Sequence, residues 1–402
     1  MQQRPVLRLK AGEERRLRAG HLWIFSNEVD TGQTPLRGFA PGEQVTVEDA
    51  RGKSLGCAYV NPSSVICARL VSRDAQVGLD RSTLVHRLQI ALAMRERLFP
   101  EPCYRLVHGE ADGLPGLVVD RFGDVCVVQP NTAGMEQVLD PIGEALERVV
   151  APQHILVRAD SPVREREGLE QRVTWLGEPG PASLTVQEAG LTFEVPAEAG
   201  QKTGWYYDQR ANRRRLAAYA AGARVLDAFA YSGAFAIAAA AAGAREAVAV
   251  ESSPEACDRI AANAERNGVD DRVTVIEGEV NDYLAAARQE GERYDVAVVD
   301  PPAFIKRRRD RRSGERGYRK VNEAALRLLG RDGVLLSCSC SAHLPEERLS
   351  GILLAAARHL DRSLRTLERG GPAPDHPTHP AIPETAYLKA LFVRSVIASS
   401  LP

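Results

Sequence analysis

The fold follows from residues 225–235, which read Val225-Leu226-Asp227-Ala228-Phe229-Ala230-Tyr231-Ser232-Gly233-Ala234-Phe235. A short apolar strand ends in an acid, and a loop with a single glycine leads into an alanine-rich helix over 234–242. The alternation continues toward the C-terminus, with strands expected over 247–251, 273–276, 294–300 and 334–340 and helices over 254–267 and 281–289. Such alternation predicts a parallel sheet with helices on both faces, a Rossmann-like α/β domain.

The N-terminal half has a different pattern. Short apolar or alternating runs, separated by turn residues, occur at 6–9, 22–25, 44–47, 55–60 and 65–71. They predict a small β-barrel. A helical spacing of leucines over 79–98, followed by strands and one helix over 135–150, predicts a central mixed α/β domain. With 402 residues the chain is long enough for two or three domains, and we expect them at 1–74, 75–195 and 196–402.

Composition argues against several classes of protein. The chain is 44% hydrophobic and 26% charged, without an apolar run long enough to span a membrane. Residues 1–10 are polar and basic, unlike a secretory signal. The seven cysteines are scattered without metal-ligand spacing, which fits reduced thiols. We expect a cytoplasmic protein with no metal and no membrane partner, while the net charge of −1 is uninformative about nucleic acid.

Acids follow three of the expected strands. Asp227 ends the first, Glu251 ends the second 24 residues later, and Glu279 comes after the third. Ligands of an open parallel sheet bind beyond the carboxyl ends of its strands, and a carboxylate at this spacing suits ribose hydroxyls. The first loop lacks a G-x-G-x-x-G fingerprint, and an acidic rim suits the cationic groups of S-adenosylmethionine better than a pyrophosphate. The alternative is that each acid only caps the next helix. The expected cofactor is therefore S-adenosylmethionine, contacted by Asp227, Phe229, Tyr231, Gly233, Glu251, Glu279 and Asp300.

The segment Asp300-Pro301-Pro302-Ala303-Phe304 follows the fourth strand. Two prolines fix an extended backbone with few N–H donors. Such a loop can hold a flat base against Phe304 while the carboxylate and carbonyls meet the polar edge of the base. Enzymes that methylate amino groups have the same type of motif, so it predicts base methylation without choosing the atom. A bare turn is the alternative.

The segment after this loop is strongly basic. Over residues 306–320, nine cations are opposed by Asp310 and Glu315. A charge run is usually a solvated face, but beside a base-binding loop it becomes a candidate track for RNA phosphates. The expected substrate-binding residues are Pro301, Pro302, Phe304, Lys306, Arg307, Arg308 and Arg309.

The fifth strand ends in Ser337-Cys338-Ser339-Cys340-Ser341. Carbon 5 of cytosine is a poor nucleophile, and its methylation requires addition of a nucleophile at carbon 6. A thiolate supplies that addition and later leaves. Asp300 is placed to bond at N3 and to offset charge that develops in the ring. Cys338 and Cys340 are two residues apart and face the same side of a strand, so spacing does not choose between them.

Several motifs resemble those of the bacterial 23S ribosomal RNA large subunit methyltransferase I family. They are, in chain order, Gly20–Ser26, Gln201–Arg210, Phe229–Gly233, Asp300–Pro302, Ser339–Ser341 and Pro383–Lys389. The resemblance implies an N-terminal PUA domain, a central mixed α/β domain and a class I methyltransferase domain that binds 23S rRNA. It also implies cytosine C5 methylation, with Cys340 as nucleophile and with Lys202 and Gln209 in segments that close over the cofactor. The segment after Cys340, Ser341-Ala342-His343-Leu344, departs from the glycine-leucine-methionine of the family.

Two other interpretations stay open. A sister group that makes 7-methylguanosine shares Asp-Pro-Pro but has asparagine where Cys340 stands, so methylation of guanine at N7 or N2 is one alternative. The other is an RNA-binding ribosome assembly factor without turnover, which the acids at three strand ends disfavour. The sequence leaves the oligomeric state open, and a homodimer is compatible with it.

Overall fold

The computed structural model describes residues 4–199 and 203–397. It contains two compact units, each made of several chain segments. The first comprises Met1–Val186, Pro196–Trp205 and Pro374–Thr385, and the second comprises Gln187–Val195, Tyr206–Ala373 and Ala386–Pro402. Each unit is therefore completed by segments that are distant in sequence.

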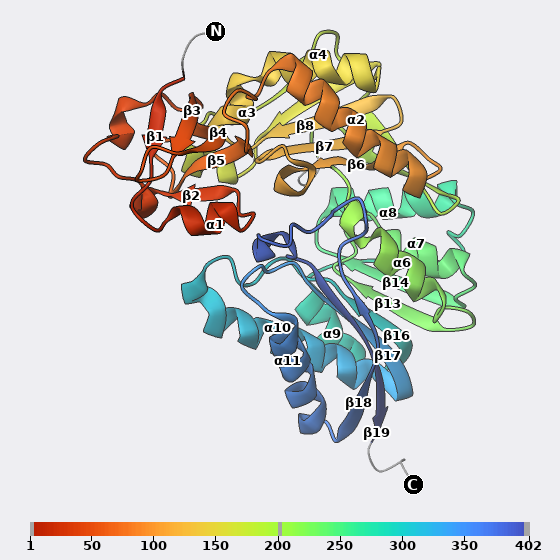
Figure 1. Cartoon of the computed structure of the whole chain (residues 1–402). Helices are drawn as coiled ribbons and strands as arrows, with labels where there is room; N and C mark the ends of the chain where they lie inside the picture. Colours follow the sequence, from red (N-terminus) through yellow and green to blue (C-terminus); the bar gives the residue numbers. More distant parts are fainter. Residues whose placement is uncertain (1–3, 200–202, 398–402) are drawn as a thin grey trace. The chain divides into compact units, whose positions relative to one another are not determined.

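The first unit begins with a five-stranded sheet of order β1-β3-β4-β5-β2 (Figure 1). Its elements are β1 (Val6–Arg8), α1 (Glu14–Arg18), β2 (Trp23–Phe25), β3 (Gln44–Glu48), β4 (Ser54–Val60) and β5 (Ile66–Ser72). Beyond β2 the chain returns along β1, where Lys10 N–H donates to the Glu28 carbonyl and Asp30 N–H to the Arg8 carbonyl, each at 2.9 Å. This pairing joins the two edges of the sheet, and the predicted barrel is confirmed.

A second five-stranded sheet, of order β10-β9-β8-β7-β6, follows in the same unit. Its strands and helices are α2 (Arg81–Leu98), β6 (Cys103–His108), β7 (Leu117–Phe122), β8 (Val125–Pro130), α3 (Ala133–Gln137), α4 (Leu139–Val149), β9 (His154–Ala159), α5 (Val163–Glu167) and β10 (Arg172–Leu176). The single helix expected over 135–150 was wrong, because the chain breaks at Val138. Pro141 lacks an N–H and is tolerated only in the first turn of a new helix.

The chain also contains a two-stranded sheet and six short 3₁₀ turns within the described residues. The strands β11 (Ser183–Glu188) and β12 (Leu191–Pro196) form a two-stranded sheet. The 3₁₀ turns are η1 (Ser26–Glu28), η2 (Leu36–Gly38), η3 (Gly109–Asp112), η4 (Tyr207–Gln209), η5 (Arg308–Asp310) and η6 (Pro383–Thr385).

The second unit contains a seven-stranded sheet of order β15-β14-β13-β16-β17-β19-β18. Its strands are β13 (Arg224–Ala228), β14 (Glu246–Glu251), β15 (Val273–Glu277), β16 (Tyr294–Val299), β17 (Leu329–Ser339), β18 (Arg362–Gly370) and β19 (Lys389–Ile397). The first five strands in this order pair in parallel, and β19 pairs antiparallel with β17 and β18. In chain order, β14 and β15 add to one side of β13, and β16 then pairs with the other side of β13. This reversal is a topological switch point, where open α/β sheets bind ligands.

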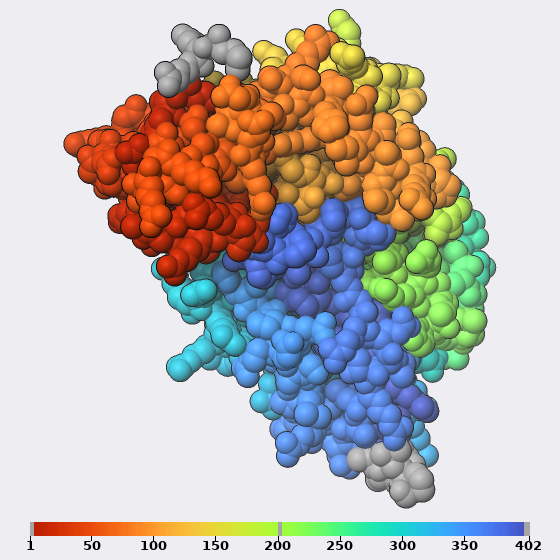
Figure 2. Space-filling view, in the orientation of Figure 1, coloured from red at the N-terminus to blue at the C-terminus, as the bar shows by residue number. Residues whose placement is uncertain are grey.

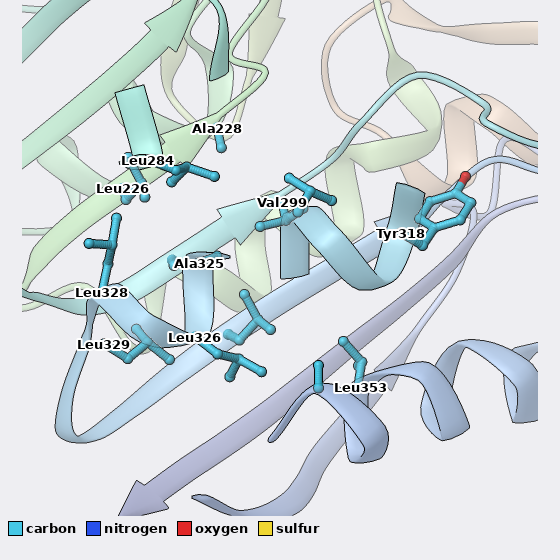
Figure 3. Packing of buried hydrophobic residues seen from close by; sticks show 14 of the residues in the cluster. Leu226, Ala228, Leu284, Val299, Tyr318, Ala325, Leu326, Leu328, Leu329 and Leu353 are labelled. Carbon is cyan, nitrogen blue, oxygen red and sulfur yellow. The ribbon is translucent and has the colours of Figure 1, made fainter. Parts of the chain in front are cut away.

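Helices cover both faces of this sheet, as predicted (Figure 1). One layer contains α6 (Arg210–Ala217), α7 (Ala234–Ala241) and α8 (Pro254–Arg266), and the other contains α9 (Val280–Gln289), α10 (Arg311–Leu328) and α11 (Glu346–His359). In the second layer, Leu326 of α10 packs with Val299 of β16 in a large apolar cluster (Figure 3). Tyr318 belongs to the same cluster but carries a hydroxyl, which must find a partner because the side chain is fully buried.

Candidate functional site

The loop after β13 is held in an unusual conformation. Phe229 and Tyr231 have φ of 69° and 53°, in the left-handed region that non-glycine residues rarely adopt. Gly233 has φ of +77°, and a Cβ there would lie 2.7 Å from Ile260 Cγ2. Glycine is therefore required at position 233, while the two aromatic residues are held under strain. Strain of this kind gathers at ligand sites.

Asp227 closes β13 and is 1% exposed. Ala236 N–H, in the first turn of α7, donates to its Oδ2 at 3.0 Å. Its Oδ1 is buried and has no hydrogen-bond partner among the described residues. Burial raises the pKa of Asp227 to about 7, and the nearby carboxylates of Asp300 and Glu251 add to the rise. One carboxylate oxygen thus acts as a helix cap, and the other is left for a ligand.

Glu251 holds the strained loop from the end of β14. Tyr231 N–H donates to its Oε2 at 2.8 Å, and Ser252 N–H donates to its Oε1 at 2.8 Å. The cap of α8 is instead Ser253, whose hydroxyl accepts from Ala256 N–H. Helix capping therefore does not explain Glu251.

Glu279 stands apart from the other two acids. It occupies the N-cap position of α9 without a side-chain cap bond, and it is exposed. The residue in register with Glu251 is Glu277, the last residue of β15. The structure thus brings Asp227, Glu251 and Asp300 together, with Glu279 two residues beyond the strand end.

Asp300 follows β16, next to β13 in the sheet. Gln209 Nε2 donates to Asp300 Oδ2 at 2.9 Å, and Asn212 Nδ2 donates to Gln209 Oε1 at 2.6 Å. These buried amides fix the carboxylate that the sequence singled out. Lys202, expected near Gln209, lies outside the described residues.

Tyr206 lies near both the loop after β13 and the residues that follow β16 and β17. Its ring meets that of Tyr231 edge-on, with centroids 5.2 Å apart. Burial raises the pKa of Tyr206, and interactions with Tyr231, Asp300, Asp208 and Cys340 raise it further. The loop after β13, the carboxylate after β16 and the thiol after β17 therefore surround one tyrosine, which sequence reasoning did not select although it lies in the motif Gln201–Arg210.

The structure distinguishes the two cysteines of β17. Cys338 is fully buried, and burial raises its pKa well above the usual value. Cys340 is partly exposed, one residue beyond the strand end. The five other cysteines are buried, as expected of small apolar residues. Of these two thiols, Cys340 is therefore the accessible one.

A hydroxyl cluster anchors the residues on both sides of Cys340. Ser339 and Ser341 each bond the hydroxyl of Tyr318 at 2.9 Å. Ile305 N–H also donates to Ser341 Oγ, at 3.2 Å. The buried tyrosine of α10 thereby ties the tip of β17 to the segment after Asp300, and satisfies its own hydroxyl.

The loop after Asp300 packs against α10. Pro301 is buried and Pro302 is exposed. The half-buried ring of Phe304 lies with its centroid 4.8 Å from that of Tyr318. A Cβ at Gly314 would overlap the Phe304 carbonyl, so a glycine is needed for this close approach. One side of the Phe304 ring is therefore occupied by the protein.

The basic segment continues this loop onto the surface, and its cyan chain projects outward in Figure 2. Lys306, Arg307, Arg308 and Arg309 are exposed. Arg309 pairs with Asp310 at 3.9 Å. Four exposed cations recur every fourth residue and form no ion pair with the part of the chain that the structure describes: Arg308, Arg312, Arg316 and Lys320. Arg312, Arg316 and Lys320 lie one turn apart on the same face of α10, and Arg308 lies in η5 just before the helix. We call these four residues the basic stripe.

Within residues 4–199 and 203–397, no group of three or more histidine, cysteine, aspartate or glutamate side chains could hold a metal ion. No helix in the same residues combines the length and the apolar character needed to cross a membrane.

Two family models match the chain. One describes S-adenosylmethionine-dependent methyltransferases and matches residues 134–394, and the other describes a PUA-like domain and matches residues 7–73. Among solved structures, a Streptococcus mutans protein assigned as a S-adenosylmethionine-dependent methyltransferase has a TM-score of 0.81 at 21% identity, over 97% of this chain and 100% of that one. This likeness concerns the fold and confirms the predicted fold class.

Curated relatives match almost end to end. The ribosomal RNA large subunit methyltransferase I of Erwinia tasmaniensis is 37% identical over 398 residues, which cover 96% of this chain and 98% of the relative. That of Klebsiella pneumoniae strain 342 is 37% identical over 395 residues, or 97% and 98% of the two chains. The cofactor prediction is confirmed by the first family model, since it describes enzymes that use S-adenosylmethionine. The chain belongs to the ribosomal RNA large subunit methyltransferase I family of S-adenosylmethionine-dependent methyltransferases.

Proposed function

We propose that this protein methylates carbon 5 of a cytosine in 23S ribosomal RNA in the cytoplasm, through a transient bond between Cys340 and carbon 6 of the base. The observation that carries the proposal is an accessible thiol, Cys340, which directly follows β17, the strand that pairs with β16 ahead of Asp300. Methylation of oxygen or of an amino group needs no such thiol. The relatives named above are ribosomal RNA methyltransferases, which supports RNA as the substrate.

The reaction requires Cys340 as a thiolate. Its sulfur adds to carbon 6 and makes carbon 5 nucleophilic. S-adenosylmethionine supplies a methyl group that is electrophilic because it is bonded to a sulfonium. Carbon 5 takes that methyl group and then loses its proton, and the electrons of the C5–H bond re-form the double bond as the sulfur of Cys340 leaves. The enzyme thus returns to its starting state.

Asp300 is proposed to meet the polar edge of the base at N3. Gln209 fixes one of its carboxylate oxygens, which keeps the carboxylate oriented beside Pro301 and Pro302. A group held in advance in this way stabilises developing charge without reorganising.

The cofactor is proposed to bind at the carboxyl ends of β13 and β14. Asp227 and Glu251 would face its cationic and ribose groups, and the strained loop would enclose it. The residues assigned to this binding are Asp227, Phe229, Tyr231, Gly233, Glu251, Glu279, Asp300, Gln209 and Lys202.

The domains are proposed to span residues 1–74, 75–195 and 196–402, with RNA binding assigned to the first of them. The match of a PUA-like model to residues 7–73 supports this first boundary.

A trapping experiment tests the role of Cys340. Fluorine at carbon 5 cannot leave as a proton does, so 23S rRNA transcribed with 5-fluorocytidine should stay bonded to the enzyme after methyl transfer. Denaturing gels should show the adduct for wild type and for Cys338→Ala, the matched control, and none for Cys340→Ala. An undiminished adduct in Cys340→Ala would overturn the assignment, and full activity of Cys340→Ser would favour guanine methylation instead.

The pKa of Asp227 predicts a stability effect with a definite sign. The pKa rises from 3.8 to about 7 on folding. The native state therefore holds the proton more tightly, and stability present below about pH 4 is lost as pH rises through 7. Asp227→Asn should raise the free energy of unfolding at pH 8 by on the order of a few kcal/mol, while weakening S-adenosylmethionine binding about ten- to a hundredfold. Thermal melts and calorimetry measure both.

The matched control for this variant is Asp332→Asn. Arg394 lowers the pKa of Asp332, so this variant should lose a little stability and leave cofactor binding unchanged. Lower stability of Asp227→Asn at pH 8, or unchanged cofactor affinity, would contradict the role given to Asp227.

The basic stripe predicts a salt effect on RNA binding. Removal of a cation that neutralises one phosphate should reduce the slope of log Kd against log salt by about 0.7–0.9. Arg312→Gln and Arg316→Gln should each show this reduction for 23S rRNA in filter binding. Arg311→Gln is the matched control, because Arg311 already pairs with Glu315 at 2.9 Å. Equal slopes for all three variants and wild type would rule out the stripe as a phosphate track.

A further inference from the structure

Lys389 is a buried cation at the start of β19. It pairs in register with Ser339 of β17, one residue before Cys340. The residue is 7% exposed. Nζ donates to the Ser341 carbonyl and to the Tyr387 carbonyl, each at 2.6 Å. Lys389 therefore lies against the segment that presents the proposed nucleophile.

Both hydrogen bonds of Nζ go to carbonyls, and no carboxylate pairs with Lys389 within the described residues. A buried ammonium without a counter-ion is strongly disfavoured. Burial accordingly lowers the pKa of Lys389 to about 8, while the nearby Cys340 favours the charged lysine and raises this pKa. Two carbonyls occupy two of the three N–H positions, and the third position can carry either a proton or a lone pair.

Phenols and carboxylates lie near Cys340. Tyr318 and Tyr206 both interact with Cys340 and are buried phenols with raised pKa values. Asp300 and Asp208 raise the pKa of both Tyr206 and Cys338, as Cys340 also does. The two carboxylates and the thiol therefore belong to one cluster. A thiolate beside these carboxylates needs a cation.

We propose that Lys389 is the counter-ion of the Cys340 thiolate: the thiol proton passes to its amine, and the resulting ammonium, held by the Ser341 and Tyr387 carbonyls, stabilises the thiolate until carbon 6 is attacked. The step moves one proton from sulfur to nitrogen and breaks or forms no other bond. The proposal rests on the proposed function for its purpose, but the pairing itself can be tested without RNA or S-adenosylmethionine. Lys389 is a positioning residue, since it acts through Cys340.

Alkylation by iodoacetamide tests the pairing, because only the thiolate reacts. Peptide mass spectrometry follows the label at Cys340, and Cys340→Ala gives the background. At pH 7 the rate for Lys389→Met should fall about tenfold, as expected when a neighbouring charge is removed. Lys389→Arg keeps a charge and should stay within about threefold of wild type. Arg394→Met is the matched control and should not change the rate. Arg394 lies on β19, as Lys389 does, but it pairs with Asp332.

A purely structural lysine would give a different result. It would tie β19 to the carbonyls of Ser341 and Tyr387 and leave the alkylation profile of Lys389→Met equal to that of wild type, which would overturn the proposal. Should Lys389→Met fail to fold by circular dichroism, Lys389→Gln, whose amide can still donate to a carbonyl, takes its place. A folded Lys389→Arg whose rate falls tenfold would also overturn it.

The outcomes separate this inference from the proposed function. Slower alkylation in Lys389→Met without any fluorocytosine adduct in wild type would retain the counter-ion and reject cytosine C5 chemistry. An adduct that forms in wild type, with alkylation unaffected by Lys389→Met, would retain the chemistry and reject the counter-ion.

Discussion

The candidate site depends on the parallel pairing of β16 between β13 and β17. Val298 of β16 is in register with Asp227 of β13, and Val299 is in register with Ser337 of β17. The carboxyl ends of all three strands therefore meet at one edge. The carboxylate after β13, the rigid loop after β16 and the thiol after β17 are neighbours because of this register, although more than a hundred residues separate Asp227 from Cys340. A slip by one residue would turn each side chain to the other face.

The same edge concentrates groups that lower stability. Asp227 is buried beside two other acids, and Phe229 and Tyr231 adopt left-handed backbone angles. Lys389 is buried against carbonyls instead of a carboxylate. Each of these features disfavours folding, and under the proposed function a cationic cofactor would offset the cost at Asp227 and a thiolate the cost at Lys389. Natural enzymes commonly trade stability for function at such positions.

Much of the fold could be predicted from sequence. The strand–helix alternation after residue 222 and the short strands before residue 72 both indicated the correct architecture. Apolar residues recur with the period of a helix or a strand because one face of each element is buried. Apolar spacing predicts one helix over 135–150 because it continues through Pro141, whereas the missing N–H of that proline favours the start of a new helix at Leu139. Local pattern also could not order the seven strands, since that depends on pairing between distant segments.

The site was predicted only in part. Acids at strand ends and the Asp-Pro-Pro motif are local signals, and they predict Asp227, Glu251 and Asp300 as site residues. The structure brings these three carboxylates together, and their roles stay predictions. The spacing of Cys338 and Cys340 does not tell which thiol is accessible, because accessibility depends on how deeply each side chain is buried in the fold. Tyr206 and Lys389 lie in motifs on which the family resemblance rests, yet nothing in those motifs says which side chain reaches the thiol. Their proximity to Cys340 depends on the tertiary fold, and the roles given to them are proposals.

The proposed chemistry requires that the methylated atom be carbon 5 of cytosine, and the identity of the product decides this. The purified protein is incubated with unmodified 23S rRNA and S-adenosylmethionine carrying an isotope-labelled methyl group, the RNA is digested to nucleosides, and the labelled product is identified by mass spectrometry. We expect labelled 5-methylcytidine from wild type and none from Cys340→Ala. A labelled methylguanosine, or 5-methylcytidine formed at the wild-type rate by Cys340→Ala, would contradict the proposed chemistry.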